Sequence, residues 1–118
     1  RSFLDIGCIV PCGSDFPVEE IHPILGMYAG ITRADLAGNP PGGWRPEQKM
    51  TREEVIKGFT RWAAYAAFQD SILGSIEPGR LADIVVMSKN FLTIPPEEIP
   101  TAKVDMTIVG GNVVYERK

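Results

Sequence analysis

The residues in this chain that could do chemistry begin with Asp15, in the stretch "GCIVPCGSDFPV" at 7–18. A short apolar run, Cys8-Ile9-Val10, precedes the carboxylate and is typical of a buried strand. In α/β proteins, ligands and metals are usually held where strands end. A carboxylate there can orient a metal-activated water and take its proton. A loop containing Gly, Ser, Asp and Pro is equally typical of a turn aspartate in any fold.

The other reactive side chains near Asp15 have weaker support. Ser14 has no partnering base in the pattern, so we expect it to shape the loop rather than to act as a nucleophile. His22 is the only histidine and directly precedes Pro23, which favours a role at the start of a helix. On a strand, the Cα atoms of Cys8 and Cys12 would be about 13 Å apart, whereas a disulfide needs less than ~7 Å. Both cysteines are therefore predicted to be reduced and mostly buried, and with one histidine we expect no zinc site made by this chain alone.

Bulk composition excludes several function classes. The net charge is −3 and the 12 Lys and Arg residues are scattered, which argues against a nucleic-acid-binding face. No apolar run approaches the ~20 residues that a membrane helix needs. The chain begins with Arg1 rather than Met, so we expect a processed product or a piece of something longer. The compartment stays open, with the cytoplasm slightly favoured.

The elements that must position these residues follow from periodicity and turn chemistry. The clearest is a helix over 51–68, opened by the capping box "TREE" and carrying Val55, Phe59, Trp62 and Ala66 on one face. The remaining expected elements are a strand within 3–12, a loop at 13–18, a helix over 22–34 weakened by two glycines, a loop at 38–46, a strand at 81–88, a turn or one-turn helix at 95–100, and a hairpin at 106–116 around Gly110-Gly111-Asn112. One strand at the start and three at the end suggest pieces of two larger sheets, because their edges would otherwise be open.

Five stretches, in this order and spacing, resemble the metal-dependent amidohydrolases, in particular the branch called amidohydrolase family 3. They are "GSDFPV" at 13–18, "GITR" at 30–33, "GWRPEQKMTREEVIKGFTRWAAYAAF" at 43–68, "GSIEPGRLADIVVMSKN" at 74–90 and "VGGNVVYE" at 109–116. The stretch "SIEPGRLADIVV" is common to the superfamily, whereas "GSDFPV" followed by "WRPEQ" is specific to this branch. The resemblance covers nearly the whole chain.

The resemblance implies an α+β fragment of a larger fold, a (β/α)8 barrel joined to a composite β-sandwich. Residues 1–70 would supply the end of the barrel, namely strand 8 and the helices after it, and residues 71–118 the C-terminal part of the sandwich. A complete barrel takes ~250 residues, so this chain cannot contain one.

By the same resemblance, Asp15 matches the catalytic, metal-binding aspartate at the end of strand 8. Trp44 would line the substrate entrance or pack at the barrel rim. Arg33 would bind a substrate carboxylate or, more simply, form a surface salt bridge. Asp83 is expected to satisfy turn amides in "EPGRLAD".

The implied function is that of the C-terminal portion of a hydrolase of C–N amide bonds, on N-acyl or cyclic amide substrates. The cofactor would be a divalent metal, zinc by expectation, in the full-length parent only, and the piece alone would be inactive. Its implied partners are the missing N-terminal part of the same chain, a small-molecule amide substrate and a second copy in a homo-oligomer. The alternative is a non-catalytic binding or oligomerisation module derived from an amidohydrolase.

Overall fold

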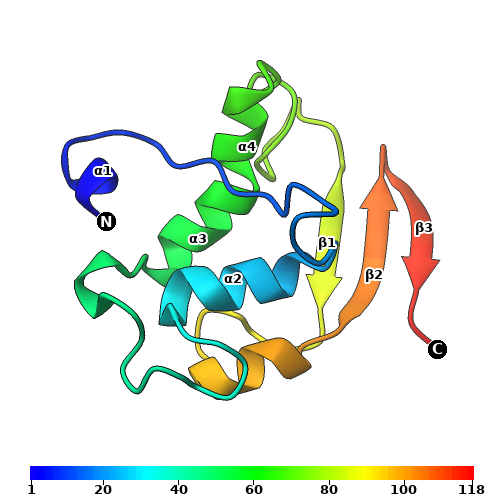
Figure 1. Ribbon diagram of the computed structural model, residues 1–118. Helices are drawn as coiled ribbons and strands as arrows, with labels where there is room; N and C mark the ends of the chain where they lie inside the picture. Colours follow the sequence, from blue (N-terminus) through cyan, green and yellow to red (C-terminus); the bar gives the residue numbers. More distant parts are fainter.

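The computed structural model describes residues 1–118 and shows a sheet on one side of the molecule and helices on the other (Figure 1). The α-helices are α1 (Ser2–Asp5), α2 (Pro23–Thr32), α3 (Arg52–Phe59) and α4 (Arg61–Ala66). Two short 3-10 helices are η1 (Pro46–Gln48) and η2 (Pro96–Thr101), and the strands are β1 (Ile84–Met87), β2 (Val104–Val109) and β3 (Asn112–Glu116). This is a small α+β arrangement, as predicted. No helix has both the length and the hydropathy to cross a membrane.

The sheet is antiparallel, in the order β1-β2-β3, so β2 is central and the two other strands are edges. The β2–β3 hairpin confirms the prediction made from Gly110-Gly111-Asn112. Both glycines have positive φ (55° and 83°), which a two-residue hairpin loop of this kind requires. Two hydrogen bonds tie the turn to the approach to β1: Gly110 N donates to Asp83 Oδ1 (2.7 Å) and Gly111 N to Ala82 O (3.1 Å).

The core lies between α2, α3 and η2. Its buried members are Ile24, Tyr28, Val55, Phe91, Ile99 and Ala102. The two glycines that weakened the prediction of α2 are the residues that let α3 approach. A Cβ at Gly26 would lie 2.7 Å from Phe59 Cζ, and a Cβ at Gly30 would lie 3.0 Å from Val55 Cγ2. Packing therefore explains why α2 contains two glycines, although helix propensity alone argues against a helix there.

The predicted single helix over 51–68 is wrong in its continuity. The capping box is confirmed: Glu54 N donates to Thr51 Oγ1 (3.2 Å) and Thr51 N to Glu54 Oε2 (2.7 Å). At Thr60, however, the backbone leaves helical geometry (φ −128°, ψ −92°), and α4 starts afresh at Arg61. Thr60 is β-branched, and its hydroxyl donates to Ile56 O at 2.7 Å, a back-bond that disfavours straight helix. As a result, Val55 is buried whereas Ala66 is exposed.

The strand predicted within 3–12 is also wrong. Residues 2–5 form α1, and residues 8–14 have no regular structure. The only backbone hydrogen bond that ties residues 8–12 to a distant part of the chain runs from Cys12 N to Gly58 O (3.0 Å). A strand needs a neighbour to satisfy its donors and acceptors, and β1, β2 and β3 pair only with one another. Cys8 and Cys12 are free, as predicted, but Cys8 is exposed and Cys12 half-buried, because no sheet covers this segment.

Much of the apolar surface stays in contact with solvent. Only nine of the 118 residues are buried, and all five residues of β3 are exposed. The accessible surface is 8011 Å², against roughly 6,300 Å² expected for a compact monomer of this mass. The excess indicates that these elements do not cover one another as those of a self-contained domain do.

Candidate functional site

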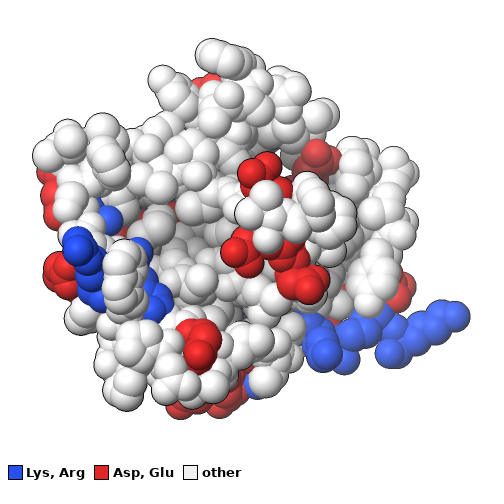
Figure 2. Space-filling model, viewed as in Figure 1, with Lys and Arg blue, Asp and Glu red and all other residues white.

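Asp15 lies in an exposed turn ahead of α2. Its backbone is in the left-handed region (φ 48°), which aspartate tolerates better than most residues. The turn is closed by hydrogen bonds from Val18 N to Asp15 O (2.9 Å) and from Glu19 N to Ser14 O (3.2 Å). Figure 2 shows acidic side chains gathered over this loop, which also contains Glu20. The structure therefore presents the Asp15 carboxylate to solvent on an acidic surface.

The turn is positioned from α3, through the contact at Gly58. A Cβ at this glycine would lie 2.7 Å from Cys12 Sγ and 3.1 Å from Val10 O, so only glycine lets residues 10–12 lie against the helix. Burial against α3 raises the pKa of the Cys12 thiol. Asp15 follows three residues later, so this contact limits where its carboxylate can lie.

The donors in this chain do not by themselves fit a metal centre. No group of three or more His, Cys, Asp or Glu side chains is placed to hold a metal ion. His22 is exposed at the N-cap of α2, the helix-start position predicted for it, and its side chain makes no capping hydrogen bond. A catalytic zinc site takes three protein ligands, so Asp15 could supply one ligand of a site whose other ligands come from elsewhere.

Arg33 and Trp44, the two residues predicted to bind substrate, lie against each other after α2. Arg33 is the C-cap of α2 (φ 53°), and its guanidinium carbon lies 4.9 Å from the centroid of the Trp44 ring. The two residues also exchange hydrogen bonds: Arg33 Nε donates to Trp44 O (2.6 Å) and Trp44 N to Arg33 O (2.8 Å). The simpler expectation, a surface salt bridge for Arg33, is wrong. The Arg33 guanidinium lies against Trp44, and no carboxylate forms an ion pair with it.

Arg45 is the residue that the sequence reasoning missed. Its guanidinium carbon lies 5.2 Å from the Trp44 ring centroid, and its own backbone is left-handed (φ 48°). Adjacency to Trp44 was the only signal in the sequence. Side chains of adjacent residues normally point in different directions. Only the loop conformation therefore places the Arg45 guanidinium near the Trp44 ring.

Asp15 does not join Arg33 and Trp44 in one pocket. Asp15 precedes α2 and Arg33 follows it (Figure 1). The helix has ten residues, a length of about 15 Å at 1.5 Å per residue. The Asp15 turn and the Arg33–Trp44 pair therefore lie at opposite ends of α2.

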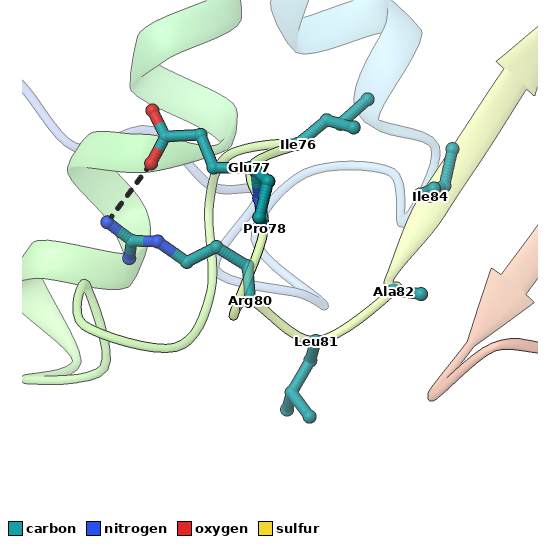
Figure 3. Close-up of a pocket in the computed structure, with 7 residues that line it drawn as sticks. All are labelled: Ile76, Glu77, Pro78, Arg80, Leu81, Ala82 and Ile84. Atoms are coloured by element: carbon teal, nitrogen blue, oxygen red, sulfur yellow. Dashed lines mark ion pairs between the residues drawn. The ribbon is translucent and has the colours of Figure 1, made fainter.

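Asp83 has the structural role expected of it, with a different partner. Its carboxylate accepts from the hairpin amide of Gly110 rather than from the "EPGRLAD" turn. Next to it is a shallow pocket of about 190 Å³ lined by Ile76, Glu77, Pro78, Arg80, Leu81, Ala82 and Ile84. Figure 3 shows Arg80 and Glu77 turned toward each other, 3.4 Å apart, and Arg80 also donates to the carbonyls of Asp70 and Leu73. These charges stabilise the loop and are not free for a ligand.

The ion pairs of Arg1 at the start of α3 are likewise structural. Arg1 Nη1 lies 2.8 Å from Glu54 Oε2, and Arg1 Nε lies 2.8 Å from Asp5 Oδ1. The hydrogen bond from Arg1 holds the pKa of Glu54 below its usual range, and the amide and hydroxyl of Thr51 act in the same direction. The carboxylate therefore stays charged while it caps α3.

Known proteins resemble this chain over nearly its whole length. A profile of the Amidohydrolase family matches residues 1–115. The chain is 33% identical over 118 residues to the protein LONG AFTER FAR-RED 3 of Arabidopsis thaliana, covering 98% of this chain and 19% of that protein. It is 32% identical over 117 residues to the N-substituted formamide deformylase of Arthrobacter pascens, covering 99% of this chain and 21% of the relative. Among solved structures, an amidohydrolase from Thermotoga maritima superimposes with a TM-score of 0.70 at 21% identity, over 98% of this chain and 25% of that one. The chain thus spans about a fifth to a quarter of the length of the proteins it matches.

Proposed function

Since the chain belongs to the amidohydrolase family, we propose that it forms the C-terminal part of a metal-dependent hydrolase of C–N amide bonds. In this proposal residues 1–70 complete the barrel and residues 71–118 contribute to the β-sandwich. The substrates are N-acyl or cyclic amides. The formamide deformylase named above is a relative whose name states an amide-type substrate, which supports the reaction class.

The observation that carries the proposal is an exposed carboxylate turn without the other members of a site. Asp15 is presented to solvent by a turn held against α3, yet no group of three metal-binding side chains forms around it. The unpaired edges of β1 and β3 and the excess exposed surface point the same way. All three features are expected if the rest of an amidohydrolase covers this surface and supplies the remaining ligands.

Asp15 is the residue of this chain that would act in the reaction. Its carboxylate takes the proton of the attacking water and returns it to the leaving amine. Asp15 would be one ligand of a divalent metal, zinc by our proposal, with the other ligands outside this chain, and that metal would lower the pKa of a bound water. The chain's own contribution is to hold the carboxylate, through the Gly58 contact and the closed turn.

The test is Asp15→Asn in the full-length protein, assayed over a panel of N-acyl amino acids and N-substituted formamides. Asparagine also tolerates positive φ, so the turn should be kept. We expect metal content near that of the wild type and a loss in kcat of at least ~10²-fold, the low end for removing a proton-transfer group. Ser14→Ala, one residue away in the same turn, is the matched control and should keep most activity. Near-normal turnover in Asp15→Asn would show that Asp15 is only a turn residue.

A non-catalytic association module is the second candidate, favoured by the exposed strand β3, which includes Val113, Val114 and Tyr115. The same assays separate the two. Absence of turnover in the wild-type full-length protein, together with stable self-association, would favour the module.

A further inference from the structure

The surface at the far end of α2 from Asp15 has the features of a ligand site. The Trp44 side chain is 59% exposed, and guanidinium groups lie 4.9 Å and 5.2 Å from its ring centroid. We call Arg33, Trp44 and Arg45 together the Trp44 clamp. Indole and guanidinium groups are the side chains most enriched at energetically important binding positions.

The backbone around the clamp is tightly determined. Gly43 is buried at φ +86°, and a Cβ there would lie 2.0 Å from Thr32 O, so no other residue fits. Both arginines of the clamp hold left-handed backbone conformations, which are costly for residues other than glycine. Strained conformations of this kind persist only where the surroundings enforce them, and they cluster at functional sites.

The preceding loop is fixed as well. Tyr28 Oη donates to Asp35 O (3.0 Å), and Asp35 Oδ1 accepts from Ala37 N (2.9 Å) and Asn39 N (2.8 Å). The clamp is therefore preorganised, which lowers the entropic cost of binding.

Both cations of the clamp lack an acidic partner. The ion pairs of the molecule involve Arg1, Arg80, Lys89 and Arg117. Arg33 uses only Nε, in its bond to Trp44 O, and the Arg45 side chain makes no hydrogen bond. Asp35 is occupied by the loop amides. The terminal N–H groups of two guanidiniums are thus available close to an exposed aromatic ring.

We propose that the Trp44 clamp binds a small carboxylate whose apolar body lies on the indole. Guanidinium groups pair with carboxylates in bidentate geometry, and the exposed ring gives the apolar part a surface to cover. Arg33 could be held in place by packing alone, but Arg45 has no structural partner other than the ring. The site is separate from the Asp15 turn and does not depend on the proposed hydrolase reaction. It requires that the rest of the full-length protein leave Trp44 and both guanidiniums uncovered, which a titration on that protein tests directly.

The test is isothermal titration calorimetry on the full-length protein carrying Asp15→Asn, so that no ligand is turned over. The probes are 3-phenylpropionate, which has no amide bond, and its neutral analogue 3-phenylpropionamide. We expect saturable binding of the carboxylate at millimolar concentration, at least about ten-fold weaker binding of the amide, and weaker binding at high salt. Arg45→Gln should weaken carboxylate binding by about ten-fold or more without lowering the melting temperature. Arg117→Gln, which removes an exposed arginine elsewhere, is the matched control and should bind as before.

The possible results separate the clamp from simpler explanations. Trp44→Leu should also weaken binding, because the apolar body loses its aromatic surface. No saturable binding, equal affinity for the amide, or unchanged affinity in Arg45→Gln would each overturn the proposal. Binding of inorganic phosphate as tight as that of the carboxylate and unaffected by Trp44→Leu would show a plain cationic patch, and would overturn it too. None of these results depends on whether Asp15 is catalytic.

Discussion

Replacing Gly58 by alanine is expected to destabilise the protein, although alanine is the better helix former. Gly58 lies inside α3, and helix propensity by itself predicts a gain of about 1 kcal/mol for this change. The structure predicts the opposite because the new methyl would be 2.7 Å from Cys12 Sγ and 3.1 Å from Val10 O. Ordinary contacts of this kind are near 3.5–4.0 Å, so residues 10–12 would have to move by roughly 1 Å.

The size of the effect follows from three terms. Forcing an extra methyl into a packed contact costs about 1–3 kcal/mol. The hydrogen bond from Cys12 N to Gly58 O (3.0 Å) would lengthen or break, at a cost of about 1 kcal/mol. Against these stands the propensity gain of about 1 kcal/mol. The net loss is about 2 kcal/mol, which lowers the melting temperature by about 8 °C at about 4 °C per kcal/mol for a domain of this size.

Thermal unfolding followed by circular dichroism measures this shift, and a double variant tests its cause. Cys12→Ala removes the sulfur that the new methyl would strike. In the Cys12→Ala background, Gly58→Ala should therefore lose much less stability than in the wild type. A rise in melting temperature for Gly58→Ala alone would refute the reasoning, since it would mean that residues 10–12 do not rest on α3. Equal losses in both backgrounds would refute the assignment to the Cys12 contact.

Three further outcomes are expected. Iodoacetamide should modify Cys8 well before Cys12. Cys8 is exposed, whereas burial raises the pKa of the Cys12 thiol and keeps it protonated at neutral pH. Equal labelling of both cysteines, measured by mass spectrometry after partial reaction, would contradict this. The pKa of Glu54 is lowered in the folded state from its ordinary 4.5, so its contribution to stability is present above pH 4.5 and is lost as the pH falls below that value. Glu54→Gln should accordingly reduce the decline in melting temperature on acidification, and an unchanged pH dependence would exclude this carboxylate as a contributor. The 118-residue chain alone should self-associate at micromolar concentration through its exposed strand edges and apolar side chains. Sedimentation equilibrium measures this, and a clean monomer that unfolds cooperatively would mean that these elements are self-sufficient.

Local chemistry was sufficient to predict several elements from the sequence. The capping box places the start of α3 at Arg52, because its two hydrogen bonds involve residues only three apart. Gly110 and Gly111 define the hairpin, because few other residues adopt positive φ at both positions of a two-residue loop. The resemblance to the amidohydrolases also came from local stretches in a fixed order, and the family match over residues 1–115 confirms it.

The remaining features depended on contacts between distant parts of the chain. An apolar run such as residues 8–10 becomes a strand only where another strand pairs with it, and here none does. The break at Thr60 separates α3 from α4 within a pattern that is apolar on one face throughout, so periodicity could not reveal it. Arg45 reaches the Trp44 ring only because a left-handed loop conformation turns it back.

The candidate site divides in the same way. Residue type and the resemblance to a family motif are the grounds on which Asp15, Arg33 and Trp44 are predicted as site residues. Their arrangement required the tertiary structure, because Asp15 lies before α2 and Arg33 at its end, and the ten-residue helix between them is about 15 Å long. The sequence shows that α2 lies between Asp15 and Arg33. Only the folded chain shows that no loop brings the two residues into one pocket.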